Sequence, residues 1–282
     1  MTAIETGSGP EGGQLASLWI GDSLSPIEQI SALSFLEQGH SLDLYTTDPV
    51  GGVPPGVRVL DAREVLPLQH IVRHRKTRSP TLHSDLFRFA LLEKTRATWV
   101  DLDLIALQPI DLSSPYLLGW ESVKEVNGAI LRLPRESPAL RALLRFDAGF
   151  VGYPPHISRT RRWKYMARSL GRGLPITSWP WGSLGPRGLT HFMRETGEIR
   201  HALPVQAFYP VPMAQAGDFL QPDRLKRTSF GPDTVAVHVW GSKLRKIVAA
   251  DFGGRIHPAS FLGEEAGRLS RWSGFDVSLS VT

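Results

Sequence analysis

The pattern of apolar and polar positions in the first part of the chain predicts strands that alternate with helices. Residues 15–20 form a short apolar run typical of a buried strand. Ser25, Pro26 and Glu28 then combine an N-cap, a proline at the first helical position and the acidic partner of a capping box. Residues 42–46 alternate like a second strand. This order predicts a parallel sheet with right-handed crossovers and a ligand site beyond the carboxyl ends of its strands.

The alternation continues further along the chain. The predicted strands are residues 57–60, 99–100, 116–120, 129–133 and 234–240, and the predicted helices are residues 81–94 and 138–146. We therefore expect an α/β fold with a central, mostly parallel sheet. The domain prediction is a disordered N-terminus at 1–14, a single domain at 15–254 and a C-terminal tail at 255–282. Within the domain, residues 151–215 are rich in Arg, Pro and Trp with weak periodicity, which predicts an irregular substrate-side region.

The amino-acid composition excludes several kinds of functional site. The 282 residues include no cysteine, which excludes disulfides, a thiolate nucleophile and Cys-ligated zinc or iron–sulfur sites, so any metal must be held by oxygen or His. The net charge of +5 fits an anionic partner. No signal peptide and no bilayer-spanning apolar run is recognised, so we expect a cytoplasmic protein. The basic run at 70–78 is either a solvated face or a peripheral contact with an anionic membrane.

Asp101 and Asp103 are the main candidate for chemistry. They are two residues apart in a segment expected to be extended, so both carboxylates can point the same way while Leu102 turns into the core. Such a pair can hold one hard cation, Mn²⁺ or Mg²⁺, with substrate phosphates completing the coordination. Taken alone, such a triplet is more often a solvated strand end or turn than a metal site.

Two other patterns add side chains to this candidate site. Asp85 and Arg88 are three apart and share one face of the helix at 81–94. The predicted strand at 234–240 places His238 and Trp240, followed by Ser242, on one side, because alternate residues of a strand share a face.

The Ser-Asp-x-x-Arg sequence at 84–88, followed by the Asp pair and Leu107-Gln108-Pro109, resembles the DXD-motif sugar transferases. That group contains α-1,4-glycosyltransferases, initiation-specific mannosyltransferases and, more distantly, glucosylating toxins. Weaker matches in the same order lie at 18–21, 127–130, 185–190 and 238–240. The glycines that usually precede the Asp pair are absent, since Arg96 and Ala97 stand there, which puts the shape of the preceding turn in doubt.

The resemblance implies a GT-A-like, Rossmann-type nucleotide-sugar-binding fold. It further implies a metal-dependent, retaining hexosyltransferase that moves sugar from a nucleotide-diphosphate sugar to a glycan or lipid-linked acceptor, for example in polysaccharide biosynthesis. The implied catalytic residues are Asp101, Asp103 and Arg88, and the implied ligands of Mn²⁺ or Mg²⁺ are Asp103 and His238. The implied substrate-binding residues are Leu18, Trp19, Ile20, Ser84, Asp85, Arg88, Asp101, Leu102, Asn127, Gly185, Pro186, Trp240, Ser242 and Lys243.

Three other functions stay open at this point. The basic charge and the Arg161, Arg162, Trp163 and Lys164 cluster suggest a nucleic-acid-binding protein, but no known module supports it, so no nucleic-acid partner is expected. The Asp pair would also serve a metal-dependent phosphohydrolase. A non-catalytic nucleotide-sugar binder would keep the same residues without turnover.

Overall fold

The computed structural model describes residues 14–281, and its centre is one six-stranded sheet with the order β3-β2-β1-β4-β7-β6. Four neighbouring strands run parallel: β3 (Val57–Asp61), β2 (Ser41–Thr46), β1 (Gln14–Trp19) and β4 (Thr98–Val100). β7 (Val126–Arg132) is antiparallel to β4, and β6 (Leu117–Trp120) is antiparallel to β7. The predicted α/β class and mostly parallel sheet are confirmed. The predicted disorder at the N-terminus falls on residues 1–13, outside the described part.

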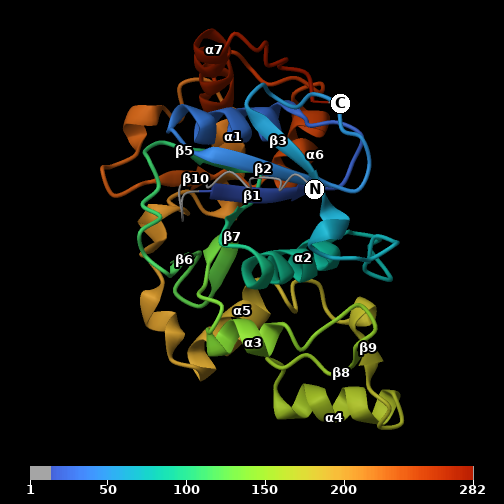
Figure 1. The fold of residues 1–282 in the computed structure, drawn as a ribbon. Helices are drawn as coiled ribbons and strands as arrows, with labels where there is room; N and C mark the ends of the chain where they lie inside the picture. Colours follow the sequence, from blue (N-terminus) through green and yellow to red (C-terminus); the bar gives the residue numbers. More distant parts are fainter. Residues whose placement is uncertain (1–13, 282) are drawn as a thin grey trace, which may run out of the picture.

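Helices cover both faces of the sheet (Figure 1). α1 (Pro26–Glu37) and α2 (Thr81–Lys94) lie on opposite sides of it. Alternate residues of β1 face two separate cores, because Leu15 packs in the cluster beneath α1 and Ala16 in the cluster beneath α2. The sheet is therefore buried on both faces, which fixes the positions of its strand ends.

Local sequence explains where the first helices begin. The predicted capping box of α1 is present, since Glu28 Oε2 accepts from the backbone N–H of Ser25 at 2.9 Å. Gly39 follows the C-cap residue Gln38 of α1, and its left-handed backbone (φ 83°) ends the helix before β2 begins. α2 has the predicted bounds, whereas α3 (Pro138–Leu143) is shorter than predicted.

Beyond the Asp pair the chain leaves the central sheet. β5 (Leu104–Ala106) pairs antiparallel with β10 (Ala236–His238), and His238 is opposite Leu104. The strand predicted at 234–240 ends early, because Trp240 adopts a left-handed backbone (φ 61°) directly before α6 (Gly241–Asp251). The prediction that His238, Trp240 and Ser242 share one face of a strand is therefore wrong.

The region at 151–215 is more regular than its weak periodicity predicts. It contains β8 (Val151–Gly152), α4 (Arg159–Arg168), β9 (Leu174–Pro175) and α5 (Pro186–Glu195). No residue of α4 is buried, so this helix has no apolar core face to reveal it in the sequence. Residues 255–282, predicted as a tail, include α7 (Phe261–Ser273), which packs on α1.

Short 3-10 turns complete the described chain: Ala62–Glu64, Ile176–Ser178, Glu198–His201, Val205–Ala207, Met213–Phe219 and Arg227–Ser229. Among the described residues, no helix combines the length and apolar character needed to cross a bilayer.

Candidate metal centre

The Asp pair lies where β4 ends, at the carboxyl edge of the parallel strands. Residues 101–103 form a tight turn, in which the Leu104 N–H donates to the Asp101 carbonyl at 3.3 Å. The prediction of an extended segment is wrong, because the chain turns here to leave the central sheet for β5. The side chain of Leu102, which lies between Asp101 and Asp103 in the sequence, is buried in the core as predicted, and this burial holds the turn in place.

Asp101, Asp103 and His238 form a compact cluster. One ligand atom from each lies within 4.8 Å of the others, and His238 Nε2 is 3.1 Å from Asp103 Oδ1. His238 reaches the pair because β10 is hydrogen-bonded to β5, the strand that follows the turn. Two carboxylates and one imidazole are a donor set that suits a divalent cation such as Mn²⁺. The cluster is thus a candidate divalent-metal site.

The electrostatics of the cluster favour an ion pair between the Asp103 carboxylate and a protonated His238. Burial alone would raise the pKa of Asp103, but the His238 side chain and the Gly241 N–H, which donates at 2.8 Å, lower it to about 2. Burial alone would lower the pKa of His238, but Asp103 and Asp101 outweigh it and raise that pKa. A bound cation would take over the role of the imidazolium proton and release it.

Arg88 joins the Asp pair to helix α2. Its Nη2 donates to Asp101 Oδ1 at 2.8 Å, its Nη1 lies 3.7 Å from Asp85 Oδ1, and its guanidinium stacks over Trp99 at 4.7 Å. Burial, opposed by Arg88, raises the pKa of Asp101 and raises that of Asp85 to about 7. The three-residue spacing of Asp85 and Arg88 puts both side chains on one face of α2, where Arg88 contacts Asp85 and Asp101.

Gly128 on β7 makes room for this guanidinium. A Cβ built at Gly128 would lie 2.6 Å from Arg88 Nη1. The backbone of β7 can therefore approach Arg88 only if residue 128 lacks a side chain.

An open cleft of about 300 Å³ adjoins the cluster, a size at the lower end of the range for small-molecule ligands. It collects residues from the ends of β1 and β4, from the start of α2 and from α6. Eight of the predicted site residues line it: Leu18, Trp19, Ile20, Ser84, Arg88, Asp101, Leu102 and Asp103. The indole N–H of Trp19 is buried without a hydrogen-bond partner among the described residues, so it has a donor to offer a ligand.

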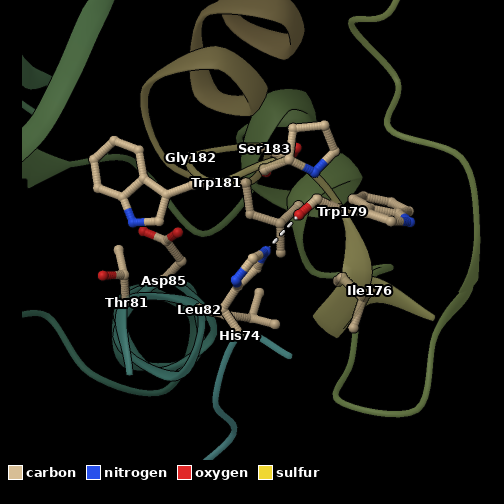
Figure 2. Close-up of a pocket in the computed structure, with 11 residues that line it drawn as sticks. His74, Thr81, Leu82, Asp85, Ile176, Trp179, Trp181, Gly182 and Ser183 are labelled. Atoms are coloured by element: carbon tan, nitrogen blue, oxygen red, sulfur yellow. Dashed lines mark hydrogen bonds between the residues drawn. The ribbon is translucent and has the colours of Figure 1, made fainter. Parts of the chain in front are cut away.

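Asp85 lines a separate, smaller cavity (Figure 2). Figure 2 shows the Asp85 carboxylate near Thr81 and the exposed indole of Trp181, on the loop that leads to α5. A Cβ built at Gly185 would lie 3.3 Å from both Asp85 carboxylate oxygens, so the predicted Gly185-Pro186 turn lies beside Asp85. Pro186 opens α5.

Seven predicted substrate-binding residues do not line the cleft: Asp85, Gly185 and Pro186, described above, and Asn127, Trp240, Ser242 and Lys243. Asn127 donates to Glu121 at 2.7 Å and accepts from the Ala129 N–H at 2.8 Å. Lys243 Nζ donates to the Met213 carbonyl at 2.7 Å. The remaining two are Trp240, whose indole donates to the Val211 carbonyl at 2.9 Å, and Ser242, which is exposed in the first turn of α6. Their contacts with a substrate stay predictions.

Trp240 nevertheless has a clear place in the site. Its ring packs edge-on against His238, with the centroids 4.2 Å apart. This contact holds the imidazole beside the Asp pair.

The sequence did not indicate Arg245. This residue of α6 lines the cleft, forms an ion pair with the buried Glu28, and lowers the pKa of Asp103. Gly241, four residues earlier on the same helix, approaches so closely that a Cβ there would lie 3.0 Å from Asp103 Cβ. If α6 had been predicted, the four-residue spacing would have placed Gly241 and Arg245 on one helical face. The contact of Arg245 with Glu28 could not have been predicted in this way, because the two residues lie 217 positions apart.

Comparisons with known proteins give limited information. No family model and no curated protein matches this chain. Among solved structures it is similar to one described as "PaToxG Glycosyltransferase", with 12% identity over 65% of this chain and 69% of that chain, and a TM-score of 0.41. What the fold and the site define is a mixed α/β protein with a candidate divalent-metal centre at the carboxyl edge of its parallel strands.

Proposed function

We propose that this protein is a metal-dependent glycosyltransferase that moves a sugar from a nucleotide-diphosphate sugar to a glycan or lipid-linked acceptor. The observation that carries the proposal is the Asp101, Asp103 and His238 cluster at an open cleft, with the buried Arg88 beside it. A sparse acidic pair leaves coordination positions that the phosphates of a substrate can fill. The resemblance of residues 84–88 to sugar transferases supports the same reading.

Different residues of the cleft suit different parts of a nucleotide-sugar donor. A divalent cation held by Asp103 and His238 would supply positive charge for the departing diphosphate. Mn²⁺ suits this pair better than Mg²⁺, because it accepts an imidazole ligand more readily. Arg88 and Arg245 add fixed positive charge around the same space. Trp19, at the end of β1, offers an aromatic surface and an unused N–H to the nucleotide.

Asp85 is suited to the sugar. It is buried, its pKa is raised to about 7, it lines the cavity beside Trp181, and its carboxylate lies 3.7 Å from Arg88 of the cleft. A carboxyl group in that position can accept a hydrogen bond from a sugar hydroxyl or donate one. In the transfer itself the bond between the sugar carbon and the diphosphate oxygen breaks, and a bond to the acceptor hydroxyl oxygen forms as that hydroxyl loses its proton.

A thermal-shift screen tests the proposal. A set of nucleotide-diphosphate sugars would be added with and without Mn²⁺, because a ligand that binds only the native state raises Tm. We expect a metal-dependent rise with one nucleotide class. The rise should be kept by Asp111→Asn, an exposed aspartate outside the cleft, and lost by Asp103→Asn.

Two results would contradict the proposal. One is the lack of a shift with any donor in the presence of Mn²⁺. The other is rapid release of inorganic phosphate from nucleotides without an acceptor, which would assign the site to a phosphohydrolase.

A further inference from the structure

The basic lobe, defined as residues 70–78 and 148–182, holds the whole positive excess of the chain. It contains ten Lys and Arg and no Asp or Glu, which leaves 22 Lys and Arg beside all 27 Asp and Glu elsewhere. The lobe thus carries a formal charge of +10, and the rest of the chain is acidic. A charge so unevenly distributed favours one anionic partner on one face.

The two segments form one unit. The Arg75 N–H donates to the Thr177 carbonyl at 2.8 Å, and His74 Nε2 lies 2.9 Å from the Trp179 carbonyl oxygen. All ten cations are exposed, and none forms an ion pair within the described residues. Figure 1 shows α4 at the end of the molecule opposite α7.

Large apolar side chains are exposed among these charges. Trp163 is 70% exposed and Leu170 is 81% exposed. Trp163 and Ala167 lie one turn apart on α4, and Leu170 follows its end in a left-handed backbone (φ 49°), a conformation that disfavours a branched side chain. Val151 and Trp181 add further exposed apolar surface.

We propose that the basic lobe attaches this protein to the surface of an anionic lipid membrane. Helix α4 has no buried residue and carries Arg and Lys beside Trp163, with Leu170 just beyond its end. Interfacial helices combine such residues, because their cations meet lipid headgroups while apolar side chains enter the acyl boundary. Nucleic acid would use the cations and Trp163, but Leu170 and Val151 have no counterpart in a phosphate backbone. The attachment does not depend on the transfer reaction, so either can fail without the other.

Co-sedimentation of the full chain with vesicles tests the attachment. We expect binding to an equimolar mixture of phosphatidylcholine and phosphatidylglycerol, weak binding to phosphatidylcholine alone, and a decrease with added salt. The charge variant Arg161→Gln/Arg162→Gln/Lys164→Gln should partition on the order of a hundredfold more weakly, since each basic residue near an anionic surface contributes about a factor of five.

The apolar contribution has its own variant and a matched control. Trp163→Ser/Leu170→Ser should weaken partitioning about tenfold without changing Tm, because both side chains are exposed. The control is Arg271→Gln/Trp272→Ser on α7, which removes the same kinds of exposed residue at the opposite end and should bind like the unaltered protein.

Three outcomes would overturn the proposal. The first is equal binding to neutral and anionic vesicles, and the second is unchanged binding of the Trp163→Ser/Leu170→Ser variant. The third is tighter binding to a single-stranded oligonucleotide than to anionic vesicles, which would assign the lobe to nucleic acid.

Discussion

Charged side chains are paired at the metal centre and unpaired in the basic lobe, among the residues that the structure describes. At the metal centre Arg88 lies between Asp85 and Asp101, and His238 lies against Asp103. In the basic lobe ten cations face water, and none forms an ion pair with another residue of the described range 14–281. Charges removed from water need partners, whereas exposed charges are stabilised by water and gain little from pairing. Substitutions at the centre should therefore change stability as well as binding, and substitutions in the lobe should change binding alone.

Arg88→Met should have the largest effect on stability. The change keeps the length of the side chain but leaves the carboxylates of Asp85 and Asp101 without their cation. We expect the free energy of unfolding to fall by about 3–5 kcal/mol, the range for removing one partner of a buried ion pair. Urea denaturation followed by circular dichroism measures it, with Arg161→Met in the lobe as the matched control. A loss below about 1 kcal/mol would mean that the buried carboxylates do not need Arg88.

Glu198→Gln tests whether hydrogen bonds alone stabilise a buried carboxylate, in place of the cation that Arg88 supplies at the metal centre. Burial alone would raise the pKa of Glu198, but hydrogen bonds from Ser137, Thr196 and the Ala139 N–H lower it below its ordinary 4.5. The stabilisation is therefore fully present above pH 4.5 and is lost as the pH falls through the lower folded-state pKa. At neutral pH the substitution should reduce the free energy of unfolding by about 1–3 kcal/mol.

The pH dependence of that difference is the check. Denaturation of both proteins across the acidic range should show the difference shrinking as Glu198 becomes protonated. A difference that grew with acidity would contradict the assigned direction of the pKa shift.

Arg245→Gln and Lys243→Gln compare a residue found in the structure with one predicted from the sequence. Arg245 lines the cleft, whereas Lys243 donates to the Met213 carbonyl. We expect Arg245→Gln to weaken nucleotide-sugar binding about tenfold, as for a lost charged contact, and Lys243→Gln to change it by less than about twofold. Isothermal titration calorimetry in the presence of Mn²⁺ would measure both. The reverse ranking would show that Lys243 turns towards the donor when it binds.

The Arg161→Gln/Arg162→Gln/Lys164→Gln variant should have the smallest effect on stability. No residue of α4 is buried, so we expect the free energy of unfolding to stay within about 0.5 kcal/mol. Urea denaturation beside the vesicle assay would show binding lost with stability retained. A loss of stability comparable to that of Arg88→Met would erase the distinction between the two regions.

The sequence predicted the parts of this molecule that depend on nearby residues. The capping box of α1 and the bounds of α2 follow from signals within one or two turns. The placement of Asp101 and Trp19 at one edge also follows, because parallel strands bring their carboxyl ends together. The fold class and the heart of the candidate site could therefore be predicted.

What could not be predicted depends on distant partners or on missing apolar periodicity. The pairing of Arg245 with Glu28 joins residues 217 positions apart, and no local pattern marks it. The end of β10 at His238 depends on a left-handed Trp240, whose indole is held by the Val211 carbonyl. α4 escaped prediction because it buries nothing, and that same property makes it a candidate membrane surface.

The most direct test of the account is a titration of Mn²⁺ followed by electron paramagnetic resonance, in the presence of nucleoside diphosphates. The unaltered protein should bind Mn²⁺, and Asp103→Asn and His238→Ala should each bind it on the order of a hundredfold more weakly. The Asp111→Asn control should match the unaltered protein. Equal Mn²⁺ affinity in the unaltered protein and Asp103→Asn would show that the cluster of Asp101, Asp103 and His238 is not a metal centre, and would remove the basis of the proposed function.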